Sequence, residues 1–243
     1  MNKQKFFIVA CHVLWRELTH FASLSPHTFN FTFLRQGLHD TPDKLRIALQ
    51  AAIDSVEEES VEYDAVLVGY GLCSNGLAGI QARSRKLVIM RGHDCITFLL
   101  GSKQAYKTYF DQHPGTYWFS PGWIETNEQP GKERCERTRA EYVKKYGEDN
   151  ADYLMEMEQN WIREYTTAAY VDLGFGNTNA YKTYTKECAD WLNWNYDELK
   201  GDPVLVRDFV NGRWDSNRFL IVHPGETIDA YNDDSVIKAD NDE

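Results

Sequence analysis

Three cysteines in this sequence follow short apolar segments that lie far apart along the chain. They are Cys11, Cys73 and Cys95. The apolar segments that precede them are residues 5–10, 65–69 and 86–90. Continuous apolar runs of this length are typical of parallel strands that are covered on both faces. Because ligands bind outside the carboxyl ends of such strands, the sequence predicts that the three thiols meet in one pocket.

A meeting of three thiolates suits Zn²⁺ or another thiophilic metal, with the fourth position left open or held by a histidine. The predicted metal ligands are therefore Cys11, Cys73, Cys95 and His39. His93 and His12 are further candidates for the fourth position. Cys11 and Cys95 are also expected to begin helices, whose amino ends favour thiolates.

Two other interpretations of the cysteines remain open. Single cysteines without CxxC spacing are often small core residues that only pack. A redox pair is the second alternative, and the lack of a CxxC motif in the sequence disfavours it. The remaining cysteines, Cys135 and Cys188, lie in stretches with helical spacing and have no predicted role.

The segment that follows residues 65–69 is a glycine-rich turn, residues 70–76, that could cradle a ligand with main-chain amides. We expect Tyr70, Gly71 and Asn75 to contact a substrate there. The turn has neither the P-loop pattern nor the GxGxxG pattern. The alternative is a tight connection between a strand and a helix, which also requires glycine.

Residues 91–95 place a cation, an imidazole, a carboxylate and a thiol directly after another predicted strand. Such a cluster suits anion binding and proton transfer, so Arg91, His93 and Asp94 are the predicted catalytic residues. The alternative is an exposed polar turn. Farther along the chain, Trp123 could form one wall for a flat ligand, although a tryptophan beside turn residues is more often part of the core.

The elements expected to position these residues alternate between strands and helices. Strands are predicted at residues 5–10, 28–34, 65–69, 86–90, 115–119, 168–173 and 219–222, and helices at residues 11–22, 94–100, 102–110, 132–164 and 178–196 and from Pro42 onward. This alternation predicts an α/β fold, with a doubly wound, mostly parallel sheet and helices on both faces. Residues 1–232 are expected to form a single domain with a helical insertion at about 124–165, followed by a disordered acidic tail at 233–243.

Composition narrows the class of protein. The chain has 243 residues, of which 42% are hydrophobic and 26% are charged, as in ordinary globular proteins. Its net charge of −11 argues against binding to nucleic acid or to an anionic membrane surface. We expect neither a bilayer-spanning segment nor a signal peptide, because the apolar runs are too short for either. The cysteine content predicts reduced thiols and a cytoplasmic location.

The candidate site residues fall within a set of short motifs spread over roughly residues 1–225. The motifs are Cys11 with Leu14-Trp15-Arg16-Glu17-Leu18, His39 with Pro42 and Leu45, Tyr70-Gly71-Leu72-Cys73, Arg91-Gly92-His93-Asp94-Cys95-Ile96-Thr97, Pro114-Gly115-Thr116-Tyr117, Pro121-Gly122-Trp123 and Pro224-Gly225. In this combination the chain resembles an uncharacterised family of anaerobic bacterial and archaeal proteins, domain of unknown function 1638. Two residues depart from the family pattern: Met90, where a proline is usual, and His12, where a small residue is usual.

The resemblance implies that Cys11, Cys73 and Cys95 belong to the family pattern and that the other two cysteines do not. It also implies an association with corrinoid-dependent methyltransferase systems of anaerobes. We therefore predict a zinc-dependent enzyme of anaerobic one-carbon metabolism that acts on a small molecule, in its most concrete form a methyltransferase that works with a corrinoid protein. The alternatives are a non-catalytic accessory protein that binds a metal, a corrinoid or a substrate for a methyltransferase, and a purely structural partner of such an enzyme.

Overall fold

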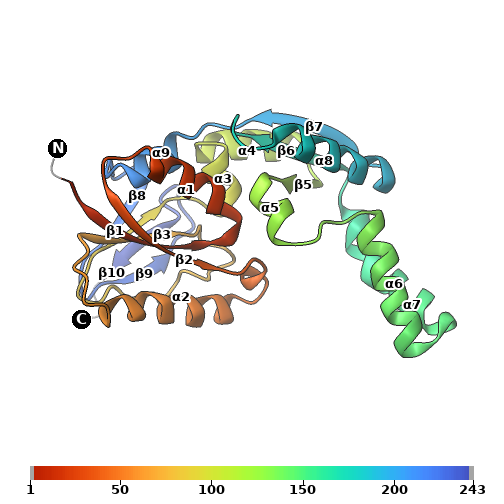
Figure 1. Cartoon of the computed structure of the whole chain (residues 1–243), viewed down its shortest axis with the longest axis horizontal. Helices are drawn as coiled ribbons and strands as arrows, with labels where there is room; N and C mark the ends of the chain where they lie inside the picture. The colour runs from red at the N-terminus through yellow and green to blue at the C-terminus, as the bar shows by residue number, and fades with distance from the viewer. Residues whose placement is uncertain (1–2, 241–243) are drawn as a thin grey trace. The chain divides into compact units, whose positions relative to one another are not determined.

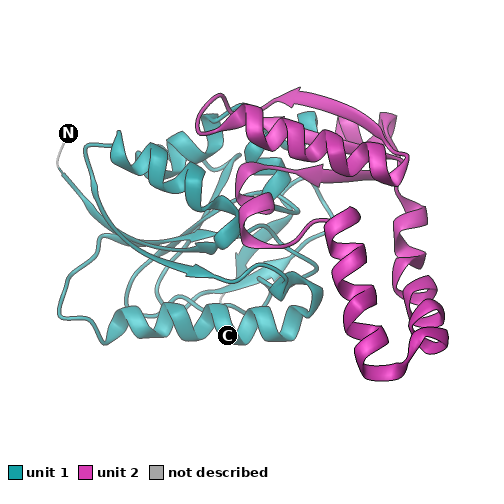
Figure 2. Cartoon of the chain, turned by 45° about the vertical axis from the view of Figure 1, so that its right-hand side comes forward, with its two compact units in different colours: residues 1–106, 202–243 teal, residues 107–201 magenta. Residues whose placement is uncertain are grey.

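A computed structural model describes residues 3–240 of the chain. The chain divides into two compact units, which Figure 2 shows in different colours. Unit 1 comprises the residues up to Tyr106 together with those from Asp202 onward, and unit 2 comprises Lys107–Gly201. The first of the two units is discontinuous in sequence. The single domain expected at residues 1–232 stays a prediction.

Unit 1 contains a five-stranded sheet in the order β2-β1-β3-β4-β8. Its strands are β1 (Lys5–Cys11), β2 (Thr28–Leu34), β3 (Ala65–Gly69), β4 (Leu87–Met90) and β8 (Phe219–Val222). The first four are parallel, and β8 pairs with β4 in the antiparallel direction. The apolar runs of β1, β3 and β4 are buried almost throughout, as expected for central parallel strands. The predicted α/β class with a mostly parallel central sheet is confirmed.

Helices lie on both sides of this sheet, with α1 and α9 on one side and α2 on the other (Figure 1). The helical segments that belong wholly or partly to unit 1 are η1 (His12–Leu14), α1 (Trp15–Ser23), η2 (Leu38–Asp40), α2 (Pro42–Glu57), α3 (Cys95–Leu99), α4 (Lys103–Gln112) and α9 (Val204–Val210). Helix α2 begins at Pro42, as predicted, and it buries Leu45, Leu49, Ile53 and Val56 along one face. Among the described residues, no helix is both long and apolar enough to cross a membrane.

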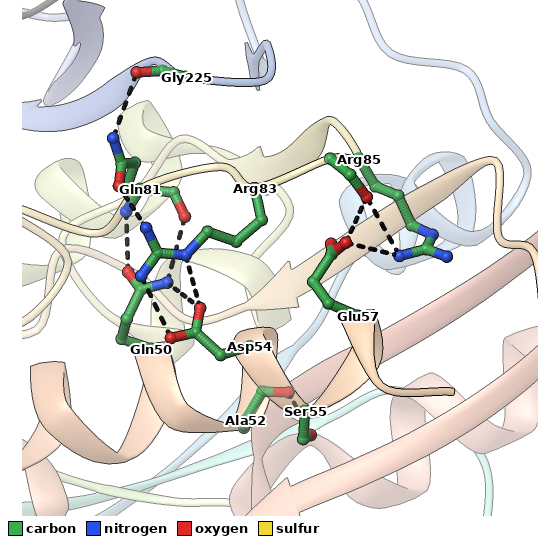
Figure 3. A network of polar contacts seen from close by, with 10 residues as sticks. Gln50, Ala52, Asp54, Ser55, Glu57, Gln81, Arg83, Arg85 and Gly225 are labelled. Atoms are coloured by element: carbon green, nitrogen blue, oxygen red, sulfur yellow. Dashed lines mark hydrogen bonds and ion pairs between the residues drawn. The ribbon is translucent and has the colours of Figure 1, made fainter. Parts of the chain in front are cut away.

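A surface network of polar side chains ties α2 to the segment that leads into β4 (Figure 3). Asp54 accepts hydrogen bonds from Arg83 Nε and from Gln50 Nε2, each at 2.7 Å. The main-chain amide of Gln81 donates to Gln50 Oε1 at 2.9 Å, and a second ion pair joins Arg85 to Glu57 on the last turn of α2. The network therefore fixes the path of residues 81–85 over the carboxyl half of α2.

The segment after β8 forms a small antiparallel pair of strands, β9 (Thr227–Ala230) and β10 (Ile237–Asp240). Part of the acidic tail that the sequence predicts to be disordered thus forms a strand, in which Ile237 is fully buried. Residues 241–243 lie outside the described residues.

Unit 2 has its own sheet of three parallel strands in the order β5-β6-β7. Its elements are β5 (Thr116–Phe119), α5 (Pro121–Thr126), α6 (Lys132–Tyr146), α7 (Glu148–Glu158), η3 (Gln159–Glu164), β6 (Thr167–Asp172), α8 (Thr178–Leu192) and β7 (Asn195–Lys200). The predicted helical segment at about 124–165 corresponds to the helices between β5 and β6. The predicted helix at 178–196 is too long, because Asn193 adopts a left-handed conformation (φ 57°) that ends α8 and the chain enters β7.

Candidate functional site

The order of strands in unit 1 places a topological switch point at the carboxyl end of β1. Strand β1 has β2 on one side and β3 on the other, so the connections diverge from β1 in opposite directions. In open α/β sheets, ligands bind at such a point of divergence. Cys11 is the last residue of β1 and therefore lies at this edge.

The ends of β1 and β3 approach each other closely because both carry small residues. Ala10 and Gly69 are register partners, so Cys11 lies level with Tyr70 at the start of the following loop. A Cβ atom added to Gly69 would lie only 2.6 Å from the Cβ of Ala10. Glycine at position 69 is thus required for the approach that brings the Cys11 and Tyr70 side chains together.

The loop after β3 contains a left-handed turn that begins at a candidate ligand. Three consecutive residues, Cys73, Ser74 and Asn75, have φ values of 45°, 55° and 68°. This conformation costs a residue with a side chain about 1–2 kcal/mol, so the surroundings must stabilise it. Arg46 of α2 does so by donating to the carbonyl oxygens of Asn75 and Ala78. The position of Cys73 is therefore fixed by the main chain.

The loop after β3 is bonded directly to the loop after β4. The amide of Cys73 donates to the carbonyl of His93 at 2.8 Å, and the amide of Leu72 donates to that of Gly92 at 2.9 Å. A Cβ atom at Gly71 would lie 2.7 Å from the main-chain nitrogen of Asp94, so only glycine allows this contact. The two loops thereby hold Cys73 beside Asp94 and Cys95.

Asp94 and Cys95 begin helix α3. Asp94 is the N-cap residue, and its Oδ1 accepts hydrogen bonds from the amide of Thr97 at 3.1 Å and from the hydroxyl of Thr97 at 3.3 Å. Cys95 is the first residue of the helix and is 8% exposed. We call Cys11, Cys73 and Cys95 the thiol cluster.

The thiols of the cluster interact electrostatically with one another. Burial, followed by the charges of Cys11, Asp94 and Cys73, raises the pKa of Cys95 well above its ordinary value. Burial, followed by Cys11 and Asp94, also raises the pKa of Cys73, and burial raises that of Cys11. Among the described residues, no cationic side chain offsets these shifts. The cluster is therefore a buried group of protonated thiols that would become strongly negative if the thiols ionised.

Two tyrosine side chains border the thiol cluster. The hydroxyl of Tyr70 is buried and has no hydrogen-bond partner of ordinary geometry, and the thiol of Cys11 is its polar neighbour. Burial raises the pKa of Tyr70, and the three cysteines of the cluster raise it further. Tyr106 on α4 hydrogen-bonds to Asp94, and its pKa is raised by burial and then by Asp94. The sequence did not predict Tyr106, because it lies in a helical stretch without any motif.

Comparison with known protein families assigns the chain to one of them. The model of the family described as Protein of unknown function (DUF1638) matches residues 33–210. The chain belongs to this family. The match takes in Tyr70, Cys73 and Cys95 and begins after Cys11. No curated protein and no solved structure matches the chain.

In this DUF1638 protein, the histidines predicted as fourth ligands do not contribute to the pKa shifts of the thiols. The side chain of His39 is 36% exposed, and its Nε2 lies 3.3 Å from Asp40 Oδ1. His93 is exposed and contributes its main-chain carbonyl to the contact between the loops. His12 is exposed and stacks on Phe33, with ring centroids 5.8 Å apart.

Arg91 is engaged with the main chain of the carboxyl-terminal segment. Its Nε donates to the carbonyl oxygens of Ser216 at 3.0 Å and Phe219 at 3.2 Å, and its Nη1 donates to those of Ser235 at 2.9 Å and Ile237. These bonds join β8 and β10 to the end of β4. They indicate a structural role for Arg91, whereas the predicted anion binding stays a prediction.

The remaining predicted residues are divided between the two units of the DUF1638 protein. Gly71 is buried against Asp94, and Asn75 is exposed on the left-handed turn. Trp123 belongs to unit 2, where its amide donates to the N-cap side chain of Ser120 at the start of α5. Among residues 3–240, no group of three or more His, Cys, Asp or Glu side chains is placed so that it could hold a metal ion. The three thiols therefore lie in the same region of unit 1, but their side chains are not arranged as the ligands of a metal ion.

Proposed function

We propose that the thiol cluster binds Zn²⁺ or another thiophilic divalent cation. The supporting observation is that the charges of Cys11 and Asp94 raise the pKa of Cys73 and Cys95, after the larger effect of burial, and that no cationic side chain among the described residues offsets these shifts. A divalent cation at this place would compensate the negative charge and would deprotonate the thiols, because metal binding and proton release are coupled. Hydrogen bonds from the main chain and from Tyr70 lower the pKa of the thiols only in part.

Binding of a metal would require the thiols to move closer together than they are in the structure. Zinc–sulfur bonds are about 2.3 Å long. The three cysteines lie on a strand end and on two loops that are bonded to each other. The unpartnered hydroxyl of Tyr70 would then lie beside the metal-bound sulfur of Cys11.

As a biochemical function we propose a metal-dependent enzyme of anaerobic one-carbon metabolism, in its most concrete form a methyltransferase that acts with a corrinoid protein. A thiolate-bound zinc ion activates a thiol or polarises a small substrate. The position of the cluster at the point of strand divergence supports a ligand site, and the family resemblance supports the class of reaction. We also propose that the chain has a doubly wound fold with a helical insertion at about 124–165, and that the protein works in the cytoplasm, where thiols stay reduced.

The first experiment is anaerobic purification followed by elemental analysis of the wild type, Cys73→Ser and Cys135→Ser. Cys135 lies in unit 2 and is the matched control. We expect about one equivalent of metal in the wild type and the control, and loss of the metal from Cys73→Ser, because a serine oxygen is a poor ligand for a thiophilic metal. Metal-free wild-type protein with normal folding would contradict the proposal.

The second candidate function is a non-catalytic accessory protein that binds a metal, a corrinoid or a substrate. The exposed side chain of Asn75 and the main-chain amides of the left-handed turn could hold a ligand without any reaction. The metal-loaded protein, mixed with a methyl donor and a corrinoid protein, distinguishes the two. An enzyme transfers many methyl groups per molecule, whereas an accessory protein binds one equivalent and shows no turnover.

A further inference from the structure

We propose that β2 is the contact surface of a homodimer, in which the β2 strands of two copies pair in the antiparallel direction through Phe31. Strand β2 lies at one edge of the sheet of unit 1, and among the described residues it pairs with β1 and with no other strand. The sheets of the two copies would then form one continuous sheet across a two-fold axis. This inference does not depend on the proposed metal site.

Strand β2 lacks the features by which natural proteins protect an edge strand. Its sequence, TFNFTFL, has no charged residue, no proline and no glycine. It is seven residues long, and its register with β1 runs without a bulge from Thr28 to Leu34. None of its side chains is buried, and that of Asn30 is exposed. Because charges, prolines, bulges and short length normally keep edge strands from pairing with another chain, nothing in the sequence of β2 opposes such pairing.

The main-chain groups on the outer edge of β2 belong to its three phenylalanines, Phe29, Phe31 and Phe33. The amide of Thr28 donates to the carbonyl of Gln4 at 2.9 Å, so Thr28 turns its main chain toward β1. Successive residues of a strand turn their amide and carbonyl groups to opposite sides, so every second residue from Thr28 faces β1. The three phenylalanines therefore present their amide and carbonyl groups away from β1.

The sequence of β2 is nearly symmetrical about Phe31. In an antiparallel pair centred there, Phe31 lies opposite Phe31 of the second copy, and Phe29 lies opposite Phe33. Each is a hydrogen-bonded pair, because both partners present outward amide and carbonyl groups. Asn30 then lies opposite Thr32, so polar residues also meet polar residues. This is the only antiparallel register in which every phenylalanine of β2 meets a phenylalanine of the second copy.

The phenylalanine side chains form a row on one face of the sheet. Between ring centroids, Phe31 lies 6.0 Å from Phe29 and 5.6 Å from Phe33, and all three side chains are partly exposed. A two-fold axis perpendicular to the sheet keeps the rows of both copies on the same face. Aromatic pairs across strands stabilise antiparallel sheets. The dimer would therefore cover apolar surface as well as form main-chain hydrogen bonds.

The distribution of charge also permits this contact between two copies of an acidic protein. The chain carries a net charge of −11, so like charges oppose its self-association. Residues 24–38, which contain β2 and its flanks, include no aspartate and no glutamate, and Arg35 is their only lysine or arginine. The edge of β2 is therefore free of the acidic residues that cause the repulsion.

The first test is sedimentation equilibrium of the full chain under reducing conditions, over a wide range of concentrations, for the wild type, Phe31→Lys and Ile47→Lys. Phe31→Lys places two like charges opposite each other at the two-fold axis. Ile47 is 71% exposed on α2, so Ile47→Lys adds the same charge away from β2 and is the matched control. Circular dichroism shows whether each variant is folded.

We expect a reversible dimer, because a seven-residue edge gives a small interface. Ile47→Lys should associate like the wild type, and Phe31→Lys should lose about tenfold or more in association constant. A wild type that stays monomeric at every concentration overturns the proposal. Equal association of folded Phe31→Lys and wild type overturns it as well.

Hydrogen exchange of the wild-type amides, followed by NMR, tests the strand and its register even if Phe31→Lys does not fold. The amides of Phe29, Phe31 and Phe33 should exchange slowly in the dimer and quickly in the monomer, whereas those of Asn30 and Thr32 are protected by β1 in both. A dimer that leaves the three phenylalanine amides unprotected overturns the proposal. Protection that is independent of concentration, or that requires a copurified polypeptide, also overturns it, because another segment or another protein then covers the edge.

Discussion

Unit 1 contains two groups of polar side chains that balance charge in opposite ways. In the network between α2 and residues 81–85, each arginine faces a carboxylate at the surface, and the side chains of Arg83 and Asp54 are 38% and 44% exposed. In the thiol cluster, the buried Cys11 and Cys95 lie with the half-buried Cys73 and Asp94, and the pKa shifts of Cys73 and Cys95 show no contribution from a cationic side chain among the described residues. The charges of the surface network therefore balance each other, whereas no cationic side chain balances the charge that the thiol cluster would carry.

The difference separates a stabilising network from a candidate binding site. Exposed ion pairs contribute little individually, because water screens them. Buried ionisable groups whose pKa values are raised by one another cost stability, and they are found where function requires them. The substitutions below test whether the two groups respond as this distinction predicts.

The largest effect is expected from Gly71→Ala, which acts on the loops that carry the cluster. The added methyl would lie 2.7 Å from the nitrogen and 2.8 Å from the Cα of Asp94, and main-chain atoms cannot rotate away. We expect the free energy of unfolding to fall by about 3 kcal/mol in urea titrations. Metal binding, where present, should fall as well because Cys73 and Asp94 are moved apart.

Gly225→Ala is the control for Gly71→Ala. A Cβ atom at Gly225 meets no atom within 4 Å, and the only cost comes from its φ of +91°. We expect a loss of about 1 kcal/mol in the same titration. Equal losses for the two variants would show that the contact between the loops is unimportant.

A smaller effect is expected from Arg91→Met. This substitution removes donors from four carbonyl groups in the carboxyl-terminal part of unit 1, including those of Ser235 and Ile237. We expect a loss of about 2 kcal/mol and faster hydrogen exchange in β10, with Arg83→Met as the surface control. Unchanged stability and exchange would instead favour the anion-binding role predicted from the sequence.

The smallest effect is expected from Asp54→Asn in the surface network. The hydrogen bond from Arg83 lowers the pKa of Asp54 below 3.8, so its contribution is fully present at neutral pH and is lost as the pH falls through the lowered value. Because the pair is exposed, the variant should lose less than about 1 kcal/mol at pH 7. Urea midpoints of wild type and variant should converge in acid. A difference that persists there would mean that the carboxylate acts through packing.

The central strands of the fold could be predicted from sequence because their apolar runs are continuous. Residues 65–69 were expected to be a buried strand and form β3. Strand β7 was missed, since the polar sequence NYDELK at Asn195–Lys200 has no apolar run and only its pairing with β6 makes it a strand. The bounds of the two compact units at Tyr106 and Asp202 are not marked by any change in composition.

For the candidate site, sequence predicted where the thiols lie but not which groups surround them. Cysteines at strand ends can be recognised from local patterns. Arg91 was interpreted from its neighbours in sequence, whereas its hydrogen-bond partners lie 125 to 146 residues away. The hydrogen bond between Tyr106 and Asp94 likewise depends on tertiary structure, and no sequence motif indicates it.

The discontinuity of unit 1 has a consequence for the protein during its synthesis. One edge of β4 pairs with β3, which precedes it, but the other pairs with β8, whose residues follow the whole of unit 2. During translation, one edge of β4 therefore stays unpaired until unit 2 and then β8 have been synthesised. Unpaired apolar edges recruit strands from other chains. Because unit 2 is encoded between the two parts of unit 1, the time needed to translate it sets the period in which a nascent chain can aggregate through β4.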